Sequence, residues 1–221
     1  LCQSQWVWMG GQANRRAAVD DPQLLYDHLQ SQSEHQRLEA AYALASQGAD
    51  GVPYLVRALR AEAAHKQERN LARAHTNPSQ LDALFALSAA GAQALAPLEN
   101  LLVDTEWPLR AAAADALGDL GRLAVGSVPL LQRALSDSAV WVRRNATEAL
   151  GHMGSDGSEA VPALAERLND PDLTVRHNAA LALAKIGPSA ESATGALQAA
   201  QEDEDLYVRE NARIALSRIE A

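Results

Sequence analysis

Aspartate and arginine recur in pairs along the second half of this chain, and each aspartate stands six positions before its arginine. A carboxylate and a guanidinium form charge-assisted, bidentate hydrogen bonds, and an aspartate at a helix start can cap free N–H groups. The spacing predicts an ion-pair ladder within or between repeated units; the alternative is that these charges are only solvated. The residues of the ladder are Asp104, Arg110, Asp137, Arg143, Asp170, Arg176, Asp203 and Arg209.

Histidine and cysteine are the other residue types that could do chemistry here, as metal ligands, acids, bases or nucleophiles. His152 and His177 stand at different positions of their repeated units, so their side chains are not expected to converge, and no acidic residue is in register with them. The chain has one cysteine, Cys2, and no phosphate-binding glycine loop or nucleophile motif. The sequence therefore predicts no enzyme activity, no metal site and no cofactor.

The Asp–Arg pairs lie in a repeated unit, because Arg110, Arg143, Arg176 and Arg209 are each 33 residues apart. Arg37 and Gln80 hold the same place in two weaker upstream copies. In all six copies alanine follows this position after three and six residues and leucine after seven, and in five copies glycine follows after eleven. These offsets trace one stripe of an amphipathic helix, helix B, which ends at the glycine.

A second amphipathic segment, helix A, precedes each helix B, often with a proline near its start, as at Pro97, Pro129 and Pro162. Neither helix can bury its apolar stripe alone, so neighbouring units must stack. A fixed period in this range is typical of a solenoid. The sequence thus predicts an all-α fold of about six two-helix repeats.

The pattern D-x5-R-x2-A-x2-A-L-x3-G resembles HEAT repeats, in particular the short type of phycobilisome-lyase-like proteins, over about residues 22–220. The resemblance implies a right-handed α-solenoid, or superhelix, whose concave face is lined by the B helices and binds partners. Related hydroxylases with this fold bind iron through His-Glu pairs on helix B, and this chain has no His-Glu dipeptide. The marks of tetratricopeptide and ankyrin repeats are absent from the chain.

Two stretches depart from the repeat. Residues 1–20 carry an apolar run, Trp6–Met9, which is either a cap over the first repeat or the tail of an upstream domain. Residues 21–221 form the predicted solenoid, with a polar, helix-forming insert at about 61–76 that lengthens helix A or adds a projecting turn. The N-terminal end of the concave face should be apolar at Leu38, Tyr42, Leu81 and Phe85, either as a groove or covered by the Trp6–Met9 run or the insert.

Composition limits the kind of partner. The net charge is −9 and only two lysines are present, which argues against binding to a phosphate backbone. No stretch approaches the roughly 18 apolar residues of a membrane-spanning helix. We expect a cytoplasmic protein, monomeric or weakly dimeric, that binds another protein and neither nucleic acid nor membrane.

Positions of helix B that lie off the buried stripe are free to contact that partner. They include a row of identical asparagines, for which the alternative is a structural role in bonding turn backbone. They also include two large aromatic residues, the type that dominates binding hot spots; for Trp141 the alternative is packing on the next turn. The predicted partner-binding residues are Trp141, Arg144, Asn145, Glu148, His152, Thr174, His177, Asn178, Leu181, Tyr207, Glu210 and Asn211.

The sequence therefore favours a non-catalytic scaffold that binds a protein on the face formed by the second helix of each repeat. Two other functions stay open. The chain could be a regulatory C-terminal appendage of a larger enzyme, which would suit the missing initiator Met and the orphan Trp6–Met9 run. By resemblance alone, it could handle a chromophore as phycobilin lyases do.

Overall fold

The structure is a computed structural model and describes residues 21–70 and 82–220 of the chain. Within this part, every regular element is helical. The α-helices are α1 (Pro22–His28), α2 (Glu34–Ser46), α3 (Val52–Asn70), α4 (Asp82–Ala89), α5 (Leu95–Leu102), α6 (Trp107–Leu120), α7 (Val128–Ala134), α8 (Val140–His152), α9 (Val161–Arg167), α10 (Leu173–Ile186), α11 (Thr194–Ala200) and α12 (Leu206–Ile219).

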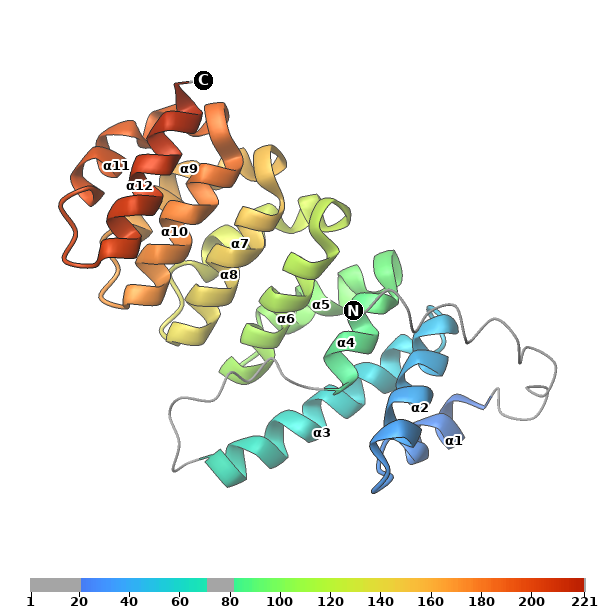
Figure 1. The fold of residues 1–221 in the computed structure, drawn as a ribbon. Helices are drawn as coiled ribbons and strands as arrows, with labels where there is room; N and C mark the ends of the chain where they lie inside the picture. The colour runs from blue at the N-terminus through green and yellow to red at the C-terminus, as the bar shows by residue number, and fades with distance from the viewer. Residues whose placement is uncertain (1–20, 71–81, 221) are drawn as a thin grey trace.

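Consecutive helices pair into six layers, α1 with α2 through to α11 with α12, and the layers stack in chain order. Figure 1 shows α6, α8, α10 and α12 side by side, with their first helices behind them. We call the surface presented by the second helices (α2, α4, α6, α8, α10 and α12) the helix-B face. The predicted all-α solenoid of about six two-helix repeats is confirmed.

Small residues let neighbouring B helices approach closely. The alanine and leucine of the predicted stripe are fully buried in the third layer, at Ala113, Ala116 and Leu117. A Cβ atom placed on Gly118 would lie 2.9 Å from the Cα atom of Ala149, so α6 and α8 are almost in backbone contact. The core is therefore built from interlocking Ala, Gly and Leu positions that few other residues could occupy.

Glycine ends the B helices, as the sequence predicts. The five glycines eleven residues after the reference position all have positive φ, from 51° at Gly121 to 68° at Gly187. Most residues avoid this conformation, and glycine adopts it freely. A short 3-10 turn, such as Gly121–Ser127 or Gly154–Ala160, then leads into the next first helix; the sequence analysis does not foresee these turns.

The aspartates of the ladder do not cap the B helices, which corrects one expectation. Asp172 is the N-cap of α10, where it accepts from the Val175 N–H at 3.1 Å. Asp170, two residues earlier, accepts from the Asp172 N–H at 2.9 Å and so fixes the turn that delivers the cap. The capping residue and the ladder residue are thus separate positions of one turn.

The insert begins as helix. Residues 61–70 continue α3, which makes it the longest helix in the described part of the chain. The remainder of the insert and the Trp6–Met9 run lie outside the described residues.

Gly118→Ala is expected to lower the free energy of unfolding by about 1–3 kcal/mol, because the added methyl group must push α8 away from α6. In an open helix the same change would stabilise the protein by about 1 kcal/mol. Gly195→Ala in α11 is the matched control, since its Cβ atom would meet nothing within 4 Å. Urea unfolding measures both; equal stability of the two variants would contradict the close approach.

Candidate functional site

The ladder arginines join each layer to the next. Arg143 donates from Nε and Nη2 to the two carboxylate oxygens of Asp170 at 2.9 and 3.0 Å. Its Nη1 donates to the backbone carbonyl of Asp137, in its own layer, at 3.0 Å. The guanidinium therefore bonds the carbonyl of its own aspartate and the carboxylate of the following one.

The same geometry recurs in the neighbouring layers. Arg110 binds the Asp137 carboxylate at 2.7 and 2.8 Å, and Arg176 binds Asp203 at 2.9 and 3.3 Å. At one end of the ladder, Asp104 forms an ion pair with the guanidinium of Arg60 on α3, at 2.7 Å. At the other end, Arg209 donates to the backbone carbonyls of Asp203 and Glu204. The ladder runs along the turns between first and second helices in the last four layers and so positions α6, α8, α10 and α12.

Two ladder carboxylates and one cap have lowered pKa values. Burial raises the pKa of Asp137, but the hydrogen bonds from Arg110 and the Ala139 N–H outweigh it. Burial likewise raises the pKa of Asp104, and the hydrogen bonds from the Glu106 N–H and Arg60 outweigh it. For Asp172 the hydrogen bonds from Arg144 are the largest cause and lower the pKa against burial. These carboxylates are thus held in the charged form by the folded structure.

The asparagine row lies between layers. The Nδ2 of Asn145 donates to the Ala111 carbonyl of α6 at 2.9 Å, and that of Asn178 donates to the Arg144 carbonyl of α8 at 3.4 Å. Asn145 is buried. The prediction that Asn145 faces a partner is therefore wrong, because the rotation of α8 turns this amide toward the previous layer. Asn211 also has a buried Nδ2, with no hydrogen-bond partner among the described residues.

Trp141 and Arg144 are partly engaged within the fold. Arg144 donates to both carboxylate oxygens of Asp172 at 2.8 and 2.6 Å, and its guanidinium carbon lies 4.7 Å from the centre of the Trp141 ring. Trp141 is half-buried and packs against the core. Trp141, Arg144 and Asp172 thus link α8 to the cap of α10.

An exposed apolar group stands at the N-terminal ends of α10 and α12. It consists of Leu173, Leu206 and Tyr207, with the half-buried His177 beside Tyr207, and we call it the Tyr207 patch. Tyr207 is 68% exposed, and Leu173 and Leu206 are also exposed. The ring of His177 stacks on that of Tyr207, with centres 6.1 Å apart and planes 23° apart. The stack holds the tyrosine ring in place on the surface.

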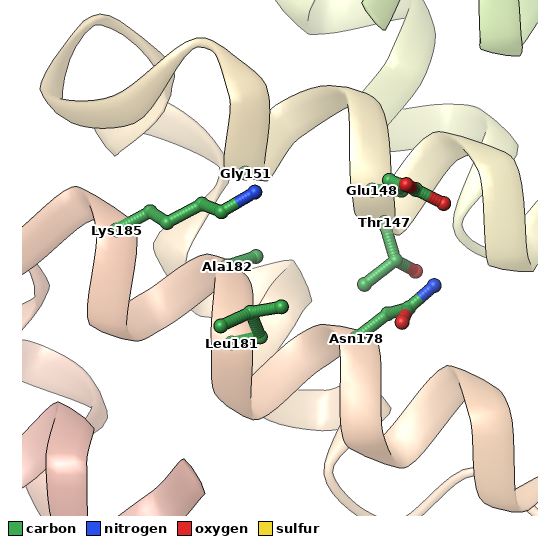
Figure 2. Close-up of a pocket in the computed structure, with 7 residues that line it drawn as sticks. All are labelled: Thr147, Glu148, Gly151, Asn178, Leu181, Ala182 and Lys185. Atoms are coloured by element: carbon green, nitrogen blue, oxygen red, sulfur yellow. The ribbon is translucent and has the colours of Figure 1, made fainter. Parts of the chain in front are cut away.

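A hollow of about 40 Å³ lies between α8 and α10 on the helix-B face. Figure 2 shows Leu181 at its floor, with Glu148 and Asn178 at one end and Lys185 at the other. An open trough of about 530 Å³ adjoins it at the C-terminal ends of α6 and α8. Its lining residues are Gly118, Asp119, Gly121, Gly151, His152, Gly154 and Lys185.

The structure thus brings Glu148, His152, Asn178 and Leu181 of the predicted set to the hollow and trough. Glu148 and His152 lie 3.9 Å apart, one turn from each other on α8. Thr174 is half-buried, and Glu210 pairs with Arg213 on α12. The predicted set omits Thr147, Gly151 and Asp119. Glycine stands eight residues after the arginine in two repeats, at Gly118 and Gly151, where neighbouring B helices approach closely beside the hollow and trough.

In residues 21–70 and 82–220, no group of three or more His, Cys, Asp or Glu side chains could hold a metal ion. No helix of that part combines the length and the apolar character needed to cross a bilayer.

Arg143→Ala is expected to lower the free energy of unfolding by about 2–4 kcal/mol. The Asp170 side chain is 1% exposed and that of Arg143 13%, so the change leaves a buried carboxylate without its main partner. Arg122→Ala is the control: Arg122 also pairs with an aspartate, Asp156 at 3.1 Å, but on the surface, and its loss should cost less than about 1 kcal/mol. Similar urea midpoints for the two variants would refute the ladder's role.

Acid should destabilise the protein through Asp172. A folded pKa below the unfolded value of about 3.9 means that the unfolded chain binds more protons, so stability is present above about pH 4 and lost as the pH falls through the folded pKa. Asp172→Asn should be less stable at pH 5 and lose less stability between pH 5 and 3 than the wild type. Glu202→Gln, an exposed control, should behave as the wild type does in urea unfolding.

Known proteins resemble this chain in part of its sequence and in its fold. The family described as HEAT repeats matches residues 127–217. No curated protein has a significantly similar sequence. Among solved structures, an engineered protein is similar at 24% identity and a TM-score of 0.58, over 90% of this chain and 96% of its own.

Two other solved structures bear on the fold. A designed armadillo repeat protein in complex with the peptide (KR)4 is 21% identical, with a TM-score of 0.57, over 90% of this chain and 98% of its own. A chain of the CpcE–CpcF phycocyanin lyase complex of Nostoc sp. PCC7120 is 19% identical, with a TM-score of 0.58, over 75% and 97%. Residues 127–217 therefore match the HEAT-repeat family, and the chain has the α-solenoid fold seen in HEAT and armadillo proteins.

Proposed function

We propose that this chain is a non-catalytic scaffold that binds a protein partner on the helix-B face of its last three layers. The observation that carries the proposal is the Tyr207 patch, where three large apolar side chains are exposed together. Contiguous exposed apolar groups mark interaction surfaces, and tyrosine is among the residues that contribute most to binding energy. The His177 stack lowers the entropy lost when Tyr207 enters a partner's pocket.

The rest of this surface suits a polypeptide better than a small molecule. Pockets for small ligands typically have volumes of about 300–1,000 Å³ and enclose most of the ligand. The hollow between α8 and α10 has about 40 Å³, room for one small side chain. The trough beside it is larger but open, with four glycines among its lining residues. An extended or loop segment could lie there and place one side chain in the hollow.

Proteins of similar fold support the same proposal. The designed armadillo repeat protein binds a peptide, (KR)4, and CpcE and CpcF form a complex with each other. A solenoid of this type can therefore present a surface to another chain. In this chain the Arg–Asp ladder keeps the B helices in fixed positions, so the partner would meet a preformed surface.

Tyr207→Ala is expected to weaken partner binding by more than about 2 kcal/mol, roughly thirtyfold, on hot-spot grounds. Affinity capture from a lysate of the source organism, followed by quantitative mass spectrometry, would compare this variant with the wild type. Leu123→Ala is the control, because Leu123 is 59% exposed but lies on a 3-10 turn away from the helix-B face. A partner retained by wild type and control and lost by Tyr207→Ala supports the proposal; equal retention by all three contradicts it.

A further inference from the structure

We propose that the helix-B face of the first four layers, from α2 to α8, binds an extended segment rich in arginine or lysine. We call this surface the aromatic–acidic surface; it comprises Tyr42, Phe85, Asp119 and Glu148. The inference rests on the proposed function, since it names the chemistry of a polypeptide segment that the same face would bind, at a place distinct from the Tyr207 patch.

Two aromatic rings lie in the open at one end of this surface. Tyr42 on α2 is 44% exposed, and Phe85 on α4 is 52% exposed. Phe85 is the only phenylalanine of the chain, and it lies at the surface, while the core is built mainly from leucine and alanine. Both residues stand five positions after the reference position of their repeats, so they occupy equivalent places on neighbouring B helices. About half of each side chain is therefore at the surface.

Carboxylates continue the surface toward the C-terminus. Asp119 on α6 and Glu148 on α8 are exposed; Glu148 lines the hollow and Asp119 the trough, and Lys185 of α10 lines both. Among the described ion pairs neither meets an arginine or lysine; Asp119 accepts from the Ser88 hydroxyl at 3.4 Å, and Glu148 lies 3.9 Å from His152. By contrast the ladder carboxylates are each paired with an arginine. The net charge of −9 adds a long-range attraction for a cationic segment.

Arginine and lysine are the side chains that fit both parts of the surface. A guanidinium binds over an aromatic ring through the ring quadrupole and binds a carboxylate through bidentate hydrogen bonds. The protein already uses the first geometry internally, with Arg57 4.1 Å from the centre of the Tyr26 ring and Arg144 4.7 Å from that of Trp141. A purely apolar segment would satisfy the rings and leave the carboxylates unpaired.

The layer spacing sets the spacing of the cations. Packed helices lie about 8–10 Å apart, and an extended chain advances about 3.3 Å per residue. One layer therefore corresponds to about three residues, and the path from α2 to α8 to about nine. A segment with a cation at every third position can place one over each ring and one against each carboxylate.

The probe is a labelled peptide of four Arg-Gly-Ser units, and its partner peptide has glutamate in place of arginine. Fluorescence anisotropy with the full chain should show the arginine peptide binding at least about tenfold more tightly than the glutamate peptide. Its affinity should fall as salt is raised from about 50 to 300 mM. Absence of binding by the arginine peptide, or equal binding of both, would overturn the inference.

Two double variants locate the site. Each double variant should lower the affinity for the arginine peptide by about tenfold or more. One is Tyr42→Ala with Phe85→Ala, and the other is Asp119→Asn with Glu148→Gln. Glu159→Gln with Glu202→Gln removes the same two charges from exposed positions off the helix-B face and should change the affinity less than about twofold. Because all substituted side chains are solvent-exposed, melting temperatures should stay unchanged. Equal weakening by both charge variants would mean unspecific attraction and refute the surface.

The two proposals can fail separately. If Tyr207→Ala loses its captured partner while the arginine peptide does not bind, the aromatic–acidic surface is wrong and the scaffold stands. If the arginine peptide binds as expected while Tyr207→Ala retains every captured protein, the Tyr207 patch is wrong as the partner site. The wild type could also self-associate. If the double variant Tyr42→Ala with Phe85→Ala abolishes that self-association, a second copy of the chain occupies the surface and the basic-segment inference is overturned.

Discussion

The arrangement of the helices in this solenoid depends on the bonds between one layer and the next. Arg110, Arg143 and Arg176 each bond a carbonyl of their own turn and the carboxylate of the following turn, so a single guanidinium links two layers. The close approach of Gly118 to Ala149 works in the same direction, because it leaves no slack between neighbouring B helices. Because the main contacts among the described helices are within a layer or between adjacent layers, these local links set the arrangement of the stack.

The ladder also decides which residues remain for binding. Side chains that point along the stack are used up by contacts between layers, as with Asn145 on the Ala111 carbonyl and Arg144 on Asp172. Side chains that point away from the stack, such as Tyr207 and Glu148, stay exposed. The helix-B face, which we propose as the binding surface, thus presents its exposed side chains on helices that the ladder links together, and the exposed residues differ from layer to layer.

The sequence was informative wherever the signal was local. The alanine–leucine stripe and the glycine stops are set by helical periodicity and by the φ angle of one residue, and both were predicted correctly. A spacing of six between aspartate and arginine does not say whether the carboxylate serves its own repeat or the previous one. The structure places it 27 residues from its arginine, in the adjacent layer. Likewise the direction of Asn145 depends on the rotation of α8 against α6, which no single repeat encodes.

The links between layers also limit where the chain can change length. Carboxylate links of 27 residues and amide links of 34 span almost every segment from α6 to α12, so an added or deleted residue there would break the register of several bonds at once. Between α3 and α4 the sequence has glutamine, Gln80, at the ladder position, and Asp104 is bonded instead by Arg60 of α3. The one long insertion falls at this interruption. For protein engineering, this junction is the natural place to graft an additional loop or domain without disturbing the periodic part of the molecule.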